Sequence, residues 1–303
     1  MANLRFVARV ALEALAEIVM KATTIGDHAV VLGAGMAGLL AARVLADAYT
    51  QVTVVDRDIL PLGVADRQGV PQGRHLHLLH ARGRELLDEL FPGLTEQLVG
   101  AGAVTADTLG GCRIQVSGQQ LRQVDIGLPA LGVSRPFLEG HVRQRVKALP
   151  SVRLVGGCDA VGLVTDSERR RVTGVHVAHR DKGATRRLMA ADLVVDATGR
   201  GLRTPVWLEQ FGYPRPEADR VEIGLGYSSR RYRLRPGALG EDMAIFTGPT
   251  PGNRRGVGVA PLEGGQHIVT LTGILGDHPP LDPAGFAAFT ASVCFPDVAE
   301  ALA

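Results

Sequence analysis

Between residues 28 and 55, two short apolar runs flank a segment in which apolar residues recur at helical spacing. Residues 28–32 form a short β-branched run, which is typical of a buried strand. Residues 39–45 then place apolar side chains at helical spacing, and residues 52–55 form a second apolar run. Since a strand, a helix and a strand follow one another closely, the pattern predicts a parallel sheet with a helix on its face.

Shorter apolar runs separated by turns predict more strands farther along the chain. In the middle region these predicted strands are 152–155, 162–165 and 172–179, and residues 188–195 then return the chain to its first domain. In the last third, they are 221–225, 243–246, 256–260 and 267–271, followed by a helix that begins near Pro283. The expected fold class is therefore α/β, with a Rossmann-type parallel-sheet domain and an antiparallel β-sheet domain.

This pattern divides the chain into three expected segments. Residues 1–25 carry a charge at every fourth position from Arg5 to Lys21, which predicts an amphipathic helix, unless Met20 is the true start. Residues 26–220 form the expected dinucleotide-binding domain with inserted strands. Residues 221–303 form the antiparallel sheet and a terminal helix.

Composition and charge limit the possible functions. The 303 residues are 46% hydrophobic and 21% charged with a net charge of +2, which excludes disorder as the main theme and does not suggest a nucleic-acid partner. A membrane-spanning helix needs about 20 nearly charge-free residues. The sequence contains no such stretch, so we expect no integral membrane segment. The three cysteines are far apart, so we expect a reduced, cytoplasmic protein.

Three histidines in one short segment suggest a metal site, but the pattern does not support it. His75, His77 and His80 have no carboxylate or cysteine at ligand spacing nearby. We therefore expect no bound metal.

A glycine motif directly follows the first predicted strand. It reads Gly33-Ala34-Gly35-Met36-Ala37-Gly38. In a dinucleotide-binding turn, the first glycine permits a sharp bend, the second lets a pyrophosphate approach the backbone, and the third lets the helix pack closely on the strand. Because strand, glycines, helix and second strand occur in order, a glycine-rich turn without a ligand is the less favoured interpretation.

The start of the following helix and the end of the second strand complete the motif. The N–H groups of Met36 and Ala37, in the first helical turn, would face the phosphates. Asp56 ends the second strand, 18 residues beyond Gly38, where an acid accepts hydrogen bonds from a ribose. The motif predicts one bound dinucleotide and does not separate NAD from FAD.

Three segments resemble FAD-dependent monooxygenases of the p-hydroxybenzoate hydroxylase type. They are residues 56–77, residues 134–146 with an R-x-x-L pattern from Arg135 to Leu138, and residues 191–200 with a strand that ends at Asp196. The resemblance implies FAD as the cofactor, NAD(P)H as a transient reductant and a small organic substrate. It also implies that the antiparallel sheet of residues 221–303 walls the substrate pocket. The implied cofactor-binding residues are Gly33, Gly35, Met36, Ala37, Gly38, Asp56, Arg57, Arg67, Arg135 and Asp196.

The resemblance also implies a third motif, a Gly-Asp strand end before a proline-containing helix, which we do not find after Asp196. Gly276 and Asp277 precede proline-rich sequence instead. We therefore expect a shortened relative or a fragment. The alternatives are an FAD-binding module without turnover, a flavin-dependent reductase or saturase, and an NAD-dependent dehydrogenase.

The residues disfavour one related enzyme class and identify no catalytic acid or base. A flavin-dependent halogenase is disfavoured, because Trp207, the single tryptophan, does not lie in the halogenase signature. No catalytic acid or base is assigned, because in flavoenzymes the cofactor carries out the bond chemistry.

Overall fold

The computed structural model describes residues 24–180, 185–201, 203–250, 252–293 and 295–302. The amphipathic helix expected in residues 1–25 lies almost wholly outside the described residues. Contacts between Cα atoms divide the chain into two units: residues 1–62 with 142–217, and residues 63–141 with 218–303. We call these unit 1 and unit 2. Residues 63–141 thus group with the C-terminal region.

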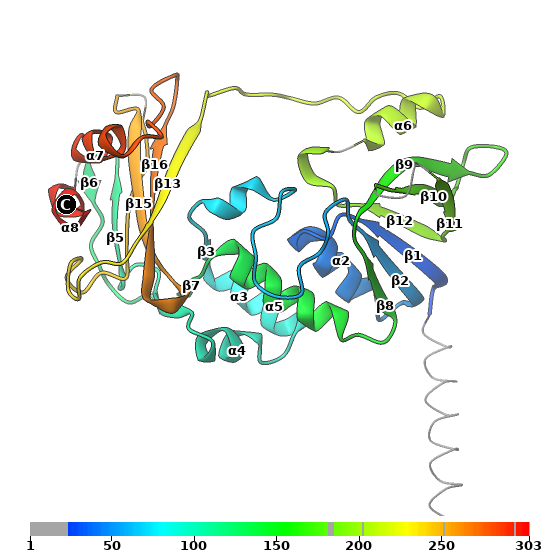
Figure 1. Cartoon of the computed structure of the whole chain (residues 1–303), viewed down its shortest axis with the longest axis horizontal. Coiled ribbons are helices and arrows are strands. Elements are labelled where there is room, and N and C mark those ends of the chain that lie inside the picture. The colour runs from blue at the N-terminus through cyan, green and yellow to red at the C-terminus, as the bar shows by residue number, and fades with distance from the viewer. Residues whose placement is uncertain (1–23, 181–184, 202, 251, 294, 303) are drawn as a thin grey trace, which may run out of the picture. The chain divides into compact units, whose positions relative to one another are not determined.

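Unit 1 contains a four-stranded parallel sheet in the order β12-β1-β2-β8 (Figure 1). Its strands are β1 (Gly26–Leu32), β2 (Tyr49–Val55), β8 (Val152–Val155) and β12 (Leu193–Asp196). The last four residues of β1 and of β2 are buried, as expected for parallel strands that are covered on both faces. The predicted parallel sheet is therefore confirmed.

A three-stranded antiparallel sheet, β11-β10-β9, covers one face of the parallel sheet. Its strands are β9 (Cys158–Thr165), β10 (Val172–His179) and β11 (Arg186–Ala190). Val30 and Leu32 of β1 share an apolar core with Val175 and Val177 of β10. Trp207 adds to this core from α6 (Thr204–Gln210), which follows the 3-10 turn η2 (Gly199–Gly201).

Residues 188–195 join the two sheets of unit 1, and the expected strand that ends at Asp196 is β12. The chain leaves the antiparallel sheet at Ala190 and enters the parallel sheet at Leu193. Asp192 fixes this change of sheet, because its Oδ2 accepts the backbone N–H groups of Asp27 and His28 at 2.8 and 3.0 Å.

Unit 2 contains a six-stranded sheet in the order β13-β16-β15-β14-β5-β6 (Figure 1). The strands are β5 (Cys112–Val116), β6 (Gln119–Gln120), β13 (Gly226–Tyr232), β14 (Ala244–Thr247), β15 (Arg255–Leu262) and β16 (Gln266–Gly273). All neighbours are antiparallel except β14 and β5, which run parallel. The core of this sheet includes Phe286 and Phe289 of α7 (Pro283–Ala291) and Val298 of α8 (Pro296–Leu302).

The strand predicted at residues 221–225 is wrong, because the structure has no strand there. Pairing between β13 and β16 ends at Gly226 and Gly273, so the residues before Gly226 have no partner strand there. Val221 is accordingly 87% exposed. Alternation of apolar and polar residues predicts a strand only where a neighbouring strand can pair with it.

The rest of unit 2 is a small antiparallel sheet with helices. The sheet, β3-β7-β4, consists of β3 (Leu78–Leu79), β4 (Val104–Asp107) and β7 (Pro129–Gly132). The helical segments are η1 (Pro71–Arg74), α3 (Ala81–Leu90), α4 (Leu94–Gly100), α5 (Arg135–Lys147) and η3 (Glu263–Gly265), and the unit boundary falls within α5. No helix in the described part of the chain has the length and apolarity that a membrane span requires.

Close packing of a helix on the parallel sheet positions the glycine turn. Helix α2 (Met36–Leu45) joins β1 to β2. A Cβ atom placed on Gly38 would overlap the carbonyl oxygen of Gly33 and lie 3.4 Å from Cγ1 of Val31. The helix therefore approaches the strand more closely than any side chain at position 38 allows.

We expect Gly38→Ala to destabilise the protein by about 1–3 kcal/mol, because overpacking forces the backbone to shift. Helix propensity acts in the opposite direction, since alanine is favoured over glycine within a helix by about 1 kcal/mol. The measurement is urea unfolding followed by circular dichroism. Gly35→Ser is the control, because a Cβ atom there meets no atom within 4 Å and serine is a favoured N-cap residue. Equal unfolding midpoints for Gly38→Ala and the original sequence would contradict this packing.

Candidate functional site

The first glycine of the motif turns the chain out of β1. Gly33 has φ +97°, a backbone conformation that residues with a side chain rarely adopt. A Cβ atom at this position would also lie 2.6 Å from the carbonyl oxygen of Ala197. The N–H group of Gly33 donates to the carbonyl oxygen of Val55 at 2.7 Å, which ties the turn to the end of β2. The turn thus begins at the carboxyl edge of the sheet.

The second glycine faces open space at the start of α2. Gly35, the N-cap residue, has φ −74° and ψ −179°, an extended conformation that any residue adopts. A Cβ atom there would meet nothing within 4 Å. The N–H groups of Met36 and Ala37 have no acceptor within the helix, because the first helical turn has no preceding turn. An anion beside Gly35 would therefore meet unpaired donors and the positive end of the helix dipole.

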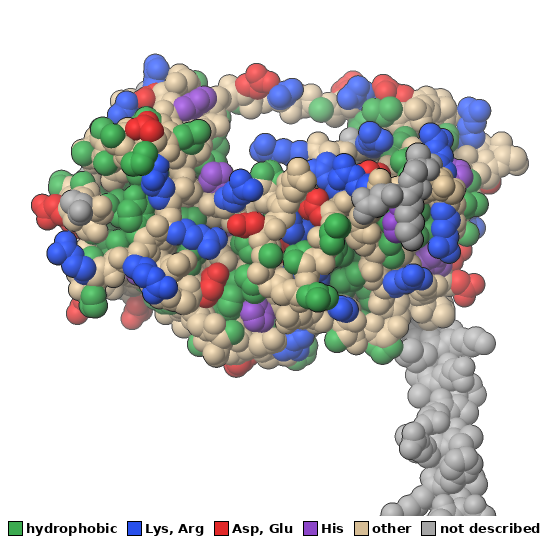
Figure 2. All heavy atoms as spheres, viewed as in Figure 1, with side chains coloured by type: hydrophobic (Ala, Val, Ile, Leu, Met, Phe, Trp, Pro, Cys, Tyr) green, Lys and Arg blue, Asp and Glu red, His purple; other side chains and the backbone are tan. Residues whose placement is uncertain are grey.

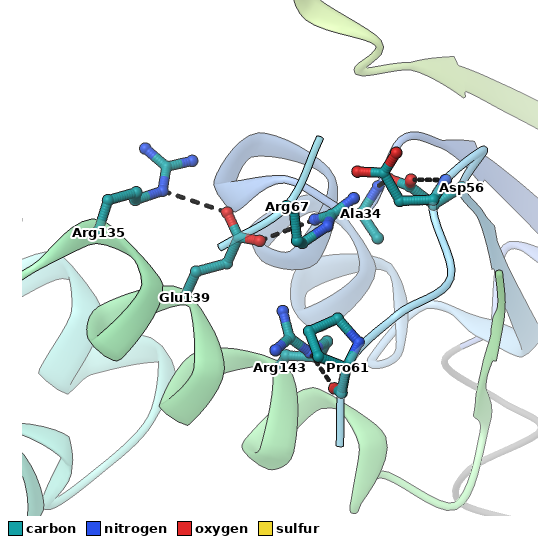
Figure 3. A network of polar contacts seen from close by, with 8 residues as sticks. Ala34, Asp56, Pro61, Arg67, Arg135, Glu139 and Arg143 are labelled. Atoms are coloured by element: carbon teal, nitrogen blue, oxygen red, sulfur yellow. Dashed lines mark hydrogen bonds and ion pairs between the residues drawn. The ribbon is translucent and has the colours of Figure 1, made fainter. Parts of the chain in front are cut away.

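Asp56 holds the turn from the neighbouring strand. Its Oδ2 accepts the Ala34 N–H at 2.6 Å, and its Oδ1 accepts the Asp58 N–H at 2.8 Å (Figure 3). The residue is buried, with 7% exposed. Both carboxylate oxygens thus support the backbone around the turn.

Asp196 lies at the same sheet edge, paired in register with Leu32. Its Oδ1 accepts the N–H and the hydroxyl of Thr198 at 3.0 and 2.6 Å, and its Oδ2 accepts the hydroxyl of Thr204 at 2.5 Å. This carboxylate therefore organises the chain between β12 and α6. Arg57, the residue after Asp56, is exposed.

The two remaining arginine candidates meet at one glutamate in unit 2. Arg67 Nη1 donates to Glu139 Oε1 at 2.7 Å, and Arg135 Nε donates to Glu139 Oε2 at 3.2 Å (Figure 3). The side chains of Arg67 and Glu139 are 4% and 3% exposed. Breaking a buried pair leaves an uncompensated charge, so this contact fixes the segment around Arg67 against α5.

Arg135 differs from Arg67 in what its guanidinium leaves available. Its side chain is 17% exposed, and within the described residues only its Nε takes part in a hydrogen bond or ion pair. In Figure 3 its two terminal nitrogens point away from Glu139. Arg135 can therefore donate to a ligand without losing its contact with Glu139.

The start of α5 is fixed by residues that the motif analysis missed. Ser134 Oγ accepts the Phe137 N–H at 3.2 Å, while the N–H and hydroxyl of Ser134 donate to Glu263 at 2.9 and 2.6 Å. The four-residue spacing of Arg135 and Glu139 could have indicated their pair. No local signal indicates Glu263, which lies 129 residues from Ser134.

Two of the three histidines weighed as metal ligands, His75 and His77, make other contacts. His75 Nδ1 lies 2.9 Å from Ser229 Oγ, and His77 Nδ1 lies 3.0 Å from the carbonyl oxygen of His75. Burial lowers the pKa of both His75 and His77, which favours neutral rings. Within the described ranges, no three His, Cys, Asp or Glu residues are arranged to hold a metal ion.

The structure thus brings the candidates together in two groups. The candidates of unit 1 at the carboxyl edge of the parallel sheet are Gly33, Gly35, Met36, Ala37, Gly38, Asp56, Arg57 and Asp196. In unit 2, Arg67 and Arg135 meet at Glu139.

The chain is similar to one curated protein along most of its length. It is 42% identical over 268 residues to Protein Rv3254 of Mycobacterium tuberculosis strain H37Rv, which covers 84% of this chain and 55% of that protein. The chain therefore spans about half the length of this relative. No protein-family model matches it.

Solved structures with a similar fold are flavin enzymes. The crystal structure of PqsL, a probable FAD-dependent monooxygenase from Pseudomonas aeruginosa, matches with a TM-score of 0.61 and 14% identity, over 82% of this chain and 61% of PqsL. The flavin-dependent brominase Bmp2 matches with a TM-score of 0.62 and 13% identity, over 91% and 64%. Further flavin monooxygenases have the same fold. The α/β fold is thus the one found in FAD-dependent monooxygenases.

Proposed function

We propose that this chain binds FAD, with the diphosphate of the cofactor against the turn of residues 33–38. The observation that carries the proposal is the open space at Gly35. There the backbone conformation does not require glycine, yet a side chain would fill the space in front of the α2 N-terminus. A close approach of phosphate oxygens to backbone N–H groups explains why glycine stands at this position.

FAD is favoured over NAD because of the fold. Similar solved structures include a probable FAD-dependent monooxygenase, a flavin-dependent brominase and the flavin-dependent monooxygenase PieE, whose structure contains FAD and substrate. The turn alone would accept either dinucleotide, since both contain an adenosine diphosphate. An NAD-dependent dehydrogenase is therefore an outcome that the experiments below distinguish.

The proposed contacts differ in strength among the candidate residues. We propose that Asp56 accepts a ribose hydroxyl, and that the terminal nitrogens of Arg135 donate to the cofactor. Arg67 is buried against Glu139, so its role would be to hold that segment in place. The exposed Arg57 and the turn-forming Asp196 would act near the pyrophosphate.

The proposed activity is that of an NAD(P)H-dependent monooxygenase acting on a small organic substrate. Bound FAD would supply electron transfer from NAD(P)H to O2. The chain would bind and orient the cofactor and exclude water from the reacting centre. We also propose a cytoplasmic location, because Cys112 and Cys158 are free thiols.

The activity is tested on the purified protein by flavin content, NADPH oxidation and O2 uptake. The proposal expects about one FAD per chain and O2-dependent NADPH oxidation that increases with a suitable substrate. Bound flavin with no NADPH oxidation would indicate a binding module without turnover, and NADPH oxidation without O2 uptake would indicate a reductase. A protein that binds NADH and retains no flavin would indicate a dehydrogenase.

The position of the diphosphate is tested by Gly35→Asp. Aspartate is a favoured N-cap residue, so the free energy of unfolding should be retained. Its carboxylate would occupy the phosphate position, and we expect FAD affinity to fall at least about tenfold, which corresponds to about 1.4 kcal/mol. The measurement is quenching of flavin fluorescence on titration.

The matched control for this variant is Gly248→Asp. Gly248 is exposed and also has open space at its Cβ position, but it lies outside the turn. It should bind FAD like the original sequence. If Gly35→Asp binds FAD equally well, the diphosphate does not lie at this turn.

The role of Arg135 is tested by Arg135→Met, which keeps an unbranched, flexible side chain and removes its donors. A hydrogen bond from a charged group contributes about 1.5–3 kcal/mol, so FAD affinity should fall about 10- to 100-fold. The control is Arg82→Met, which removes an exposed arginine that pairs with Glu85 and Glu89 on the surface. Unchanged FAD affinity in Arg135→Met would rule out a contact with the cofactor.

A further inference from the structure

A cavity lies within unit 1, between its two sheets. It has a volume of about 340 Å³ and is lined by residues of strands β1, β2, β8, β9, β10 and β11. On β1 the lining residue is His28, five residues before Gly33. At about 3.3 Å per residue along a strand, His28 is roughly 17 Å from the glycine turn. No candidate residue of the proposed FAD site lines this cavity.

The cavity exists because the facing surfaces of the two sheets change from apolar to polar along the strands. Alternate residues of a strand share one face. On β1 this face carries Val30 and Leu32 in the apolar core, and then His28 in the cavity. On β10 the same change leads from Val177 to His179. The core therefore ends where these polar residues begin.

One wall of the cavity is fixed by hydrogen bonds across the two sheets. His28 Nδ1 lies 2.7 Å from the carbonyl oxygen of Ala190, so Nδ1 carries the proton and donates. His28 Nε2 lies 2.9 Å from Thr53 Oγ1, and the His28 N–H donates to Asp192. These contacts connect β1 with β2 and with the chain after β11. The cavity is therefore preformed, which lowers the entropic cost of binding.

The lining combines positive charge with apolar surface. Arg153 of β8 and Arg187 of β11 line the cavity from the two sheets, and no carboxylate belongs to its lining. Neither arginine forms an ion pair with any residue that the structure describes. Val155, Val177 and Met189 supply apolar wall. Figure 2 shows Lys, Arg and His side chains over the region of β9–β11.

We propose that this cavity binds a small organic anion with an apolar body and one carboxylate or sulfonate group. The two guanidinium groups would attract the anionic group, and the valine and methionine side chains would contact the body. A volume of about 340 Å³ falls within the range of small-molecule pockets, about 300–1,000 Å³. The proposal rests on unit 1 alone and does not depend on FAD binding.

The test uses 2-naphthoate as the probe and isothermal titration calorimetry as the measurement. One molecule should bind per chain, and the neutral analogue 2-naphthol should bind more weakly. Arg153→Gln and Arg187→Gln should each weaken 2-naphthoate about tenfold, the effect of losing a charge-assisted contact. Both arginines are exposed, so these variants should fold.

The matched control is Arg186→Gln. Arg186 is the neighbour of Arg187 on β11, but it points to the opposite face and does not line the cavity. Its replacement should leave 2-naphthoate affinity unchanged. Saturating FAD, added to the original protein, should also leave 2-naphthoate affinity unchanged.

Three results would overturn the proposal. The first is the absence of saturable 2-naphthoate binding through the millimolar range. The second is a loss of 2-naphthoate affinity in Arg186→Gln equal to that in Arg187→Gln. The third is loss of 2-naphthoate binding in Gly35→Asp with no effect of Arg187→Gln, which would place the probe at the glycine turn. Because Gly35→Asp reports on the FAD site and Arg187→Gln on the cavity, failure of one proposal is distinguishable from failure of the other.

Discussion

The candidate site depends on the contact between the carbonyl oxygen of Gly33 and the Cα atom of Gly38. Only glycine at position 38 permits it, and it brings the first turn of α2 directly onto the end of β1. The backbone of the turn is then held from the next strand by Asp56. With the helix fixed in this way, Gly35 is left facing open space beside unpaired N–H groups.

Many of the charged candidates stabilise the fold, and this separates them by function. Asp56 and Asp196 accept backbone or hydroxyl hydrogen bonds, and Arg67 is buried against Glu139. Such side chains shape the site. The candidate groups that can donate to an anionic ligand are the N–H groups of the first turn of α2, the terminal nitrogens of Arg135 and the exposed side chain of Arg57. The donors at the turn itself belong to the backbone, which makes backbone geometry the main basis of the proposed cofactor recognition.

The sequence was most informative where structure depends on neighbouring residues. The glycine turn, α2 and the strands at 152–155 and 172–179 follow from local pattern, because burial and backbone conformation select those residue types. The pattern failed where a distant partner decides the outcome. Residues 221–225 alternate but have no strand to pair with, and Glu263 reaches Ser134 across 129 residues. The cavity at His28 depends on the facing of two sheets, which no local pattern encodes.

Hydrogen–deuterium exchange on addition of FAD tests the central claim most directly. We predict slower exchange in a peptide that covers residues 33–39, because phosphate oxygens would accept its N–H groups. The exchange rates of the strands that line the cavity at His28 should stay unchanged. FAD binding that slows exchange elsewhere in the chain and leaves residues 33–39 unaffected would contradict it.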